Sequence, residues 1–495
     1  MNQSPRFNRD ALARSTIPTL TIDSFAIEPL GVTVMPEWFQ HEGIEPVLDR
    51  LQGIGATAIA TSPYVMRECA EGDGGREPPA DGDAGRVRPL DRALWGKREL
   101  WVRTAPCFVH DLARYRGQRY QPSPPDVTTH TQGGWLDRLL AAARSRGINV
   151  YLQVMAASPP GYRVQFSNAV DEDRCFGPDG VPHDRRVDRN ASLASAHVGT
   201  YIATLLVELA QRYPGVAGFR LDWPEYPPYD FRSALFDFNP ALLSDLSRSG
   251  NDPAEVAAGV ARWAAQLGVA ARGAAANGPV AVRDALLAAN WQALFADEGP
   301  LVRLYDAKRR ASLVLLRACR AALDGVAGPR RRLEPQIFPP PLHRISGFPI
   351  GALAGVADAV GVKLYTMHWP MLARYWARDL MSGIGGEREL DAITAATADL
   401  LGFTDTLAAD GATLRYPEPH EAHPVGMRVQ GDKLREAVHL TQGIPVRAFV
   451  HSYGPTADVV KRFTLAAATG LPLWINRYGY LSDAKLGELA HYARR

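Results

Sequence analysis

The sequence has few cysteines and almost no net charge. Its four cysteines lie far apart along 495 residues, and none belongs to a Cys-x-x-Cys pair. Neither a structural zinc site nor an iron–sulfur cluster is therefore expected. A formal net charge of +2 provides no broad cationic surface for nucleic acid or an anionic membrane. We expect neither as a partner, and scattered single cysteines are typical of a reducing compartment.

Long hydrophobic runs and cofactor motifs are also missing. Residues 1–18 are polar and lack the apolar segment of a secretory signal. The longest apolar runs are too short to span a membrane. No glycine-rich phosphate loop follows any strand-like run, and no His-Glu-x-x-His occurs. These absences predict a cytoplasmic protein without a metal or other cofactor, with a tail over residues 1–19.

Short apolar runs alternate with helical patterns from about residue 30 onward. This alternation is typical of βαβ units around a parallel sheet. Eight runs are predicted as strands, over residues 30–34, 57–62, 148–155, 216–222, 332–338, 359–365, 446–451 and 471–476. Eight strands with intervening helices predict an α/β fold, a single (β/α)₈ TIM barrel over residues 20–495. A doubly wound open sheet is the alternative.

Two segments interrupt the alternation. The first, about residues 66–130, begins with a Gly, Asp, Arg and Pro stretch over residues 67–92 that we expect to be a mobile excursion without a core. The second, residues 234–327, is rich in Ala, Leu and Arg and is too long for one crossover helix. It predicts a helical insertion after the fourth strand.

Aromatic, amide and charged residues follow nearly every predicted strand. In barrels of this kind the site is built at the C-terminal ends of the strands. Aromatic faces cover the C–H surfaces of sugars, while amides and charges pair with hydroxyls. We therefore predict a carbohydrate substrate, bound by Trp38, Tyr64, Gln153, Arg220, Trp223, Tyr226, Gln336, Lys363, Tyr365, His368, Trp369, His451, Tyr453, Asn476 and Arg477.

The fourth predicted strand carries the most specific pattern. Side chains alternate along a strand, so Arg220 and Asp222 both point into the barrel. A cation beside a carboxylate favours the ionised form. This arrangement suits a nucleophile or a group that stabilises an oxocarbenium ion. The alternative is an ion pair that only stabilises the barrel.

A family resemblance supports the same segment. Gly218-Phe-Arg-Leu-Asp222 resembles the fourth-strand motif of α-amylase-type glycoside hydrolases, in which the aspartate is the nucleophile and the arginine its partner. Residues 215–228 and 474–479 resemble glycoside-hydrolase-like barrel families. The resemblance implies hydrolysis of an oligo- or polysaccharide by a carboxylate pair. The seventh strand ends in His451-Ser-Tyr453 instead of the amylase Asn-His-Asp, so an amylase is not predicted.

Several candidates remain for the general acid. Glu225 lies on the loop after Asp222, Glu334 lies across the barrel, and Glu37 is a third candidate. A carboxyl that acts as an acid needs a pKa raised by burial. Two other functions also remain open. One is a non-catalytic carbohydrate-binding barrel, and the other is a class I aldolase or lyase that uses Lys363, a strand-six lysine.

Overall fold

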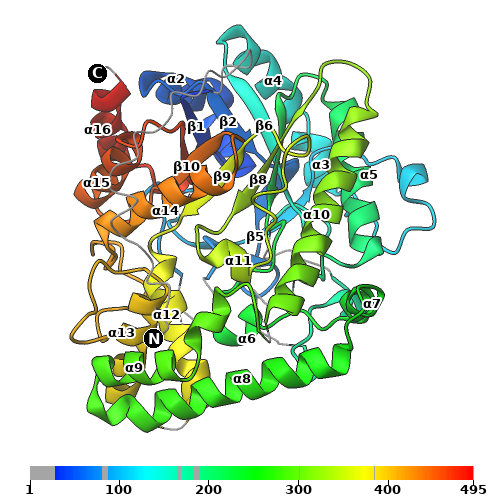
Figure 1. Cartoon of the computed structure of the whole chain (residues 1–495). Helices are drawn as coiled ribbons and strands as arrows, with labels where there is room; N and C mark the ends of the chain where they lie inside the picture. Colours follow the sequence, from blue (N-terminus) through cyan, green and yellow to red (C-terminus); the bar gives the residue numbers. More distant parts are fainter. Residues whose placement is uncertain are drawn as a thin grey trace.

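The computed structural model describes residues 28–80, 87–163, 169–182, 190–299, 301–383 and 385–493. The predicted tail, residues 1–19, lies outside them. Eight parallel strands form a closed barrel in the order β1-β11-β10-β9-β8-β7-β6-β2 (Figure 1). They are β1 (Leu30–Thr33), β2 (Ala58–Thr61), β6 (Asn149–Met155), β7 (Gly218–Asp222), β8 (Arg332–Ile337), β9 (Val360–Leu364), β10 (Val446–His451) and β11 (Leu473–Asn476). The TIM barrel is confirmed, and the open sheet is wrong.

Large and small side chains alternate inside the barrel. Trp474 on β11 projects across the interior, and a Cβ atom at the neighbouring Gly31 would overlap its ring. The indole Nε1 of Trp474 donates to Oγ1 of Thr33, 3.0 Å away. Ala58 and Ala60 belong to the same buried cluster. Small residues on β1 and β2 therefore make room for one large ring, and the barrel interior is packed.

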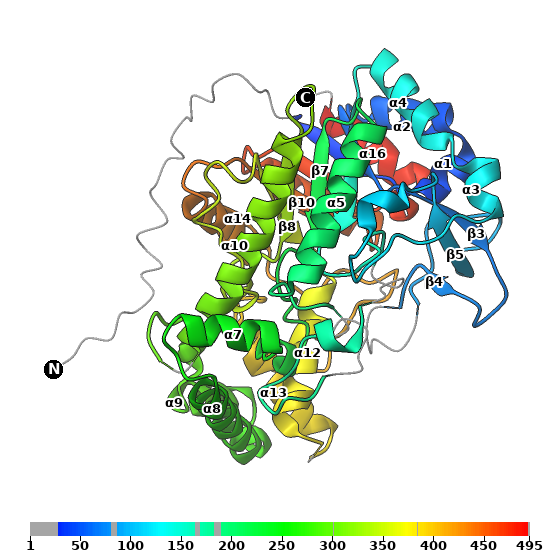
Figure 2. The same cartoon turned by 90° about the vertical axis from the view of Figure 1, so that its right-hand side faces the viewer.

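Helices cover the outside of the barrel. They include α2 (Ile44–Gly53), α4 (Trp135–Ser145), α5 (Ala196–Arg212), α10 (Val302–Asp324), α14 (Met427–Leu440), α15 (Thr456–Ala467) and α16 (Asp483–Ala493). Figure 2 shows α5 and α10 side by side over β7 and β8. Leu136, Leu139 and Ala143 of α4 are buried, as their helical spacing predicts. No helix in the described ranges is apolar and long enough to cross a membrane.

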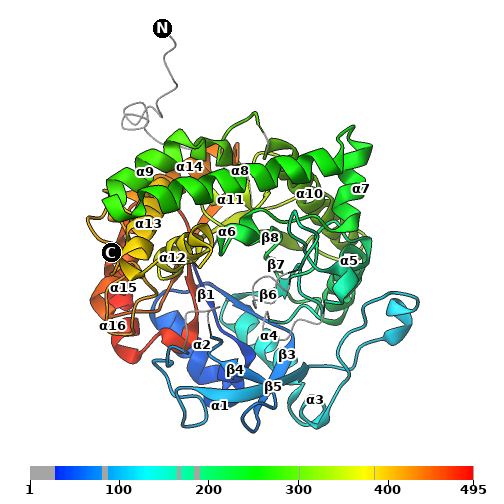
Figure 3. The ribbon, with the colours of Figure 1, turned by 90° about the horizontal axis from the view of Figure 1, so that it is seen from below.

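The excursion after β2 is more ordered than the sequence predicted. It contains an antiparallel sheet of β3 (Tyr64–Glu68), β5 (Leu100–Pro106) and β4 (Gly75–Glu77), seen in Figure 3. Leu90 and Leu94 are buried in the core, and Glu77 is buried in an ion pair. The expectation of a mobile excursion was therefore wrong for the described part of residues 67–92. The few apolar residues of this segment are enough to hold it in place, because they pack into the same buried cluster as the residues of the barrel.

The predicted helical segment divides into two parts. Helices α6 (Phe231–Ala234), α7 (Pro240–Arg248), α8 (Pro253–Ala274) and α9 (Pro279–Ala288) lie beyond the barrel strands (Figure 1). Helices α6, α8 and α9 pack against α12 (His368–Met381) and α13 (Glu387–Leu400), which follow β9, whereas α7 packs against α10 and α8. Helix α10 instead belongs to the layer around the barrel. The insertion is thus α6 to α9, and the assignment of residues 20–495 to one domain stays a prediction.

Candidate functional site

A pocket lies at the C-terminal ends of the barrel strands. Its lining residues follow six of the eight strands or come from the loops that connect them. They are Met35, Pro79, Gln153, Met155, Tyr162, Arg163, Asp222, Trp223, Tyr229, Tyr365, Met367, His368, Met371, Tyr375, Tyr416, His451, Asn476, Arg477 and Tyr480. This position is where barrels of this type build their sites. Eight of the predicted site residues meet here: Gln153, Asp222, Trp223, Tyr365, His368, His451, Asn476 and Arg477.

Asp222 is the carboxylate on the pocket wall, at the end of β7. Nζ of Lys363 lies 2.6 Å from its Oδ1 atom. Nε2 of Gln153 donates to Oδ2 at 3.3 Å, and the backbone N–H of Trp223 donates to Oδ1 at 3.1 Å. The side chain of Asp222 is 16% exposed, whereas that of Lys363 is 3% exposed. A buried ammonium group and two further donors therefore stabilise a carboxylate that faces the pocket.

Arg220 does not have the partner that the sequence predicted. It is fully buried, and its Nη2 donates to Oε1 of Gln336 at 2.6 Å. Its guanidinium carbon lies 3.8 Å from the ring centre of Trp474. Burial lowers the pKa of Arg220 to about 10. Arg220 and Asp222 do share a face of β7, but residues two apart lie almost 7 Å apart along a strand. Lys363 therefore takes the place beside Asp222 that was assigned to Arg220.

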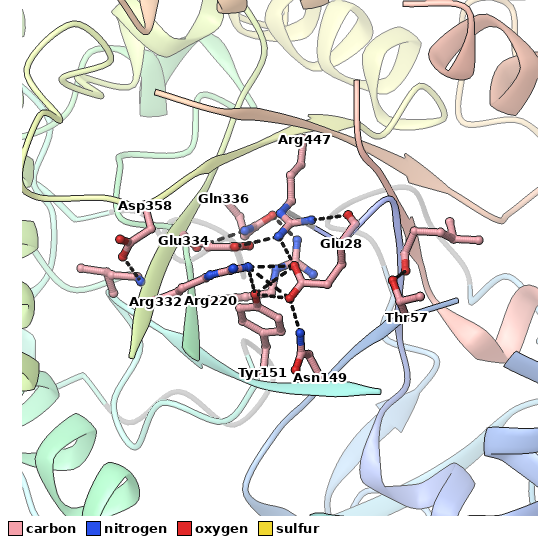
Figure 4. Close-up of polar contacts among 12 residues, drawn as sticks. Glu28, Thr57, Asn149, Tyr151, Arg220, Arg332, Glu334, Gln336, Asp358 and Arg447 are labelled. Atoms are coloured by element: carbon pink, nitrogen blue, oxygen red, sulfur yellow. Dashed lines mark hydrogen bonds and ion pairs between the residues drawn. The ribbon is translucent and has the colours of Figure 1, made fainter. Parts of the chain in front are cut away.

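Glu334 lies in a charged network inside the barrel (Figure 4), level with Arg220 and therefore deeper in the barrel than Asp222. Nη2 of Arg447 contacts Oε1 of Glu334 at 3.0 Å and Oε2 of Glu28 at 2.6 Å. Arg332 contacts Glu28 at 3.0 Å, and the hydroxyl of Tyr151 donates to the same carboxylate. Glu334 is 1% exposed and is not part of the pocket lining. Its contacts are those of a buried structural ion pair.

Glu225 is also enclosed by protein atoms. Its Oε1 accepts from the backbone N–H of Phe338 at 2.7 Å, and its Oε2 accepts from the hydroxyl of Ser346 at 2.5 Å. The residue is fully buried and does not line the pocket. Burial raises the pKa of Glu225 to about 7. The raised pKa is the property expected of a general acid, but the carboxyl group is not on the pocket wall.

Glu37 contacts a lining residue from outside the pocket. The hydroxyl of Tyr64 donates to its Oε2 at 2.9 Å, and Nη1 of Arg163 lies 3.2 Å from its Oε1. Burial raises the pKa of Glu37 to about 7. Glu37 and Tyr64 are buried and do not line the pocket. They support Arg163, which does.

The remaining predicted aromatic residues form the surroundings of the pocket. Trp38 packs edge-on against Tyr478, and Trp369 stacks on Phe403. The hydroxyl of Tyr453 donates to the carbonyl of Pro417. These rings, together with Tyr226, Gln336 and Lys363, are buried and do not belong to the pocket lining. Proximity to a strand end placed them near the site, but their apolar surface is used in the core.

His451 has a defined tautomer. The backbone N–H of Tyr453 donates to its Nδ1 at 3.0 Å. An acceptor at Nδ1 places the ring proton on Nε2. The ring lies edge-on against Tyr365, with 5.2 Å between ring centres. The backbone therefore fixes the orientation of the His451 ring on the pocket wall.

Two residues with strained backbones follow barrel strands directly. Trp223, after β7, has a φ of 54°, and Arg477, after β11, has a φ of 111°. Residues other than glycine rarely adopt such angles, and they cluster at functional sites. Both side chains line the pocket. The strain lies where the chain leaves the barrel to form the site.

Sequence reasoning missed several lining residues. Tyr229 and Tyr480 stand close to the motifs after the fourth and eighth strands and could have been found there. Arg163, Tyr375 and Tyr416 had no such signal, because they come from long connections between strands or from the helix after β9. Among the described residues, no group of three or more His, Cys, Asp or Glu is arranged to hold a metal ion.

Comparisons with known proteins give structural neighbours only. No family model and no curated protein matches the chain. A β-galactosidase from the psychrophilic Marinomonas ef1 aligns with 94% of this chain at 11% identity and a TM-score of 0.48, and this chain spans 59% of its length. A noncanonical maltogenic α-amylase from Thermotoga neapolitana aligns with 94% of this chain at 12% identity and a TM-score of 0.35, and this chain spans 76% of the length of that amylase. The assignment of the fold rests on the closed barrel itself.

Proposed function

We propose that the pocket binds a saccharide and that the protein hydrolyses a glycosidic bond with Asp222 as the ionised carboxylate. The observation that carries this proposal is the position of Asp222. Among the described residues that line the pocket, it is the only carboxylate, and it lies among the rings of Trp223, Tyr229 and Tyr365. Aromatic faces suit the C–H surfaces of a sugar, and a single anion suits a cationic transition state.

Each neighbour of Asp222 has a role in this scheme. The anomeric carbon gains positive charge as the glycosidic bond breaks, and a fixed carboxylate stabilises that charge. Lys363 holds the carboxyl group of Asp222 in place through the 2.6 Å contact. Gln153, Asn476 and the Nε2–H of His451 offer polar groups to sugar hydroxyls. The transition state is thereby stabilised more than the ground state.

The proton for the leaving group has no carboxyl donor on the described pocket wall. Glu225 and Glu334 both lie outside the lining residues. We therefore expect turnover to depend strongly on the leaving group. Nitrophenyl glycosides, whose phenolate departs without a proton, should react far faster than alkyl glycosides with the same sugar. A panel of both kinds, assayed for released phenol and released sugar, tests the proposed function.

A non-catalytic carbohydrate-binding barrel is the second candidate. The single carboxylate on the described pocket wall favours it, because glycoside hydrolases generally use two. Calorimetry with the same sugars separates the two candidates. Binding together with turnover supports the hydrolase. Binding without turnover of any nitrophenyl glycoside supports the binding barrel, and neither binding nor turnover contradicts both.

The aldolase alternative has less support. A Schiff base forms on a lysine amine that a carbonyl substrate can reach, but Nζ of Lys363 is paired with Oδ1 of Asp222 at 2.6 Å. Lys363 also lies outside the pocket lining. Incubation with aldose or ketose substrates and borohydride should leave the mass of the Lys363 peptide unchanged. A reduced adduct on that peptide would support the aldolase instead.

A further inference from the structure

Two arginine side chains line one region of the pocket and share a buried carboxylate. Arg163 follows β6, and Arg477 follows β11. Nη1 of Arg163 lies 2.7 Å from Oε2 of Glu77, and Nη2 of Arg477 lies 2.7 Å from Oε1 of the same residue. Because both guanidinium groups bind one carboxylate, they lie next to each other. The pair was brought together by two connections far apart in the sequence.

The two arginines lie between the pocket and the carboxylate that they share. Glu77 is 1% exposed and does not line the pocket, whereas both arginines do. Burial raises the pKa of Glu37, the second carboxyl that contacts Arg163. Two guanidinium groups thus line the pocket, and the carboxyl groups that orient them lie outside the lining. Lys363 beneath Asp222 offsets the charge of the remaining carboxylate.

Arg477 has an unusual backbone and a fixed side chain. Its φ of 111° is strained for a residue with a side chain. The ion pair with Glu77 orients its guanidinium group. A guanidinium group is a planar fork of five N–H donors that matches a carboxylate or phosphate. Neutral hydroxyls can be bound by uncharged donors and acceptors, and they do not need two guanidinium groups side by side.

We propose that Arg163 and Arg477 bind an anionic group of the saccharide, so that the substrate is an acidic sugar such as a uronic acid. This inference rests on the proposed function of the same pocket. Asp222 then acts at the anomeric carbon, while the arginine pair holds the acidic substituent at another position on the ring. The pair sets specificity because an acidic substituent gains charge-assisted hydrogen bonds from guanidinium groups that Glu77 already orients, whereas a neutral sugar does not.

Matched ligands provide the first test. Calorimetry and turnover are measured with nitrophenyl glycosides and the corresponding nitrophenyl uronides, which differ only in CH₂OH against carboxylate at C6. Within a pair, the uronide should bind at least roughly tenfold more tightly, and its affinity should fall as NaCl is raised. Glucose 6-phosphate and glucuronic acid, compared with glucose, show whether phosphate or carboxylate is preferred. Equal affinity within every pair, or preference for the neutral member, would overturn the inference.

Variants provide the second test. Arg477→Gln should weaken uronide binding by roughly tenfold or more and should weaken binding of the neutral glycoside much less. Arg477→Lys, which keeps the charge but loses the fork, should recover only part of the affinity. Arg248→Gln, an exposed arginine on α7 whose side chain is 68% exposed, is the matched control. Equal losses for both ligands in Arg477→Gln and Arg477→Lys would mean a structural role and would overturn the inference.

The two proposals fail differently in these experiments. Turnover of neutral glycosides without preference for uronides contradicts the arginine assignment and leaves the hydrolase intact. Uronide binding without turnover keeps the arginine assignment and supports the binding barrel. Failure of all sugars to bind contradicts both.

Discussion

Nζ of Lys363 lies 2.6 Å from Oδ1 of Asp222, although β8 separates their strands β9 and β7. Lys363 is buried, whereas Asp222 reaches the pocket. The carboxylate on which the proposed chemistry depends therefore has its counter-ion on the side away from the substrate. This arrangement leaves its open side for a positive charge that develops in the transition state.

The first prediction concerns this ion pair. Lys363→Met leaves a largely buried carboxylate without its counter-ion and should lower the free energy of unfolding by about 3 kcal/mol. The double variant Lys363→Met with Asp222→Leu removes both charges and should be less destabilised than the sum of the single variants. Urea unfolding of the four proteins measures the coupling. Additive losses would show that the pair contributes nothing as a pair.

The second prediction concerns Glu225 and pH. Its pKa is raised from 4.5 to about 7 in the folded protein, mainly by burial. The stability that this group contributes is therefore fully present below about pH 4.5 and is lost as the pH rises through about 7. When protonated, the carboxyl can donate to Ser346, whose hydroxyl proton can then turn to the carbonyl of His343, 3.0 Å away.

Glu225→Gln removes this titration. Between pH 4.5 and pH 8, the stability of the wild type relative to Glu225→Gln should fall by about 3 kcal/mol, at about 1.4 kcal/mol per pKa unit. Unfolding in urea across this range measures the difference, and the contribution of Glu37 cancels because both proteins carry it. Glu255→Gln, at an exposed position on α8, should show no such trend. A pH-independent difference would contradict the assigned pKa.

The third prediction concerns the charged network below the pocket. Arg447→Met leaves Glu28 and Glu334 buried without their shared cation and should lower the free energy of unfolding by about 3–5 kcal/mol. Glu334→Gln should also destabilise the fold, but the folded protein should retain its turnover. Denaturant unfolding and nitrophenyl release are measured on both variants. Loss of turnover in Glu334→Gln with unchanged stability would instead assign the general acid to Glu334.

Much of the barrel could be predicted because its signals are local. Alternation along the fourth predicted strand placed Asp222 on the inner face, and position at a strand end placed His451 at the same pocket. Arg220 was misplaced beside Asp222 because alternation gives direction but not depth. Glu225 has the raised pKa expected of an acid, but the path of its loop buries it against Phe338 and Ser346. Contacts between residues so far apart in the sequence leave no periodic pattern in the sequence.

The positions of Arg163 and Glu77 at the site could not be predicted from the sequence. They lie in the two long connections around β6, and their meeting with Arg477 depends on the closure of the barrel between β1 and β11. Neither residue follows a strand at a fixed spacing. Their ion pairs could be seen only in the folded chain.

The most direct test compares Asp222→Asn with the wild type on nitrophenyl glycosides and uronides. The amide keeps the shape of the side chain and removes its charge. Calorimetry measures sugar binding, nitrophenol release measures turnover, and Glu334→Gln is the matched control. We expect kcat to fall at least about a hundredfold in Asp222→Asn, while the Kd changes by less than about tenfold. Turnover that remains at the wild-type level in Asp222→Asn would contradict the assignment of Asp222 as the carboxylate of this reaction.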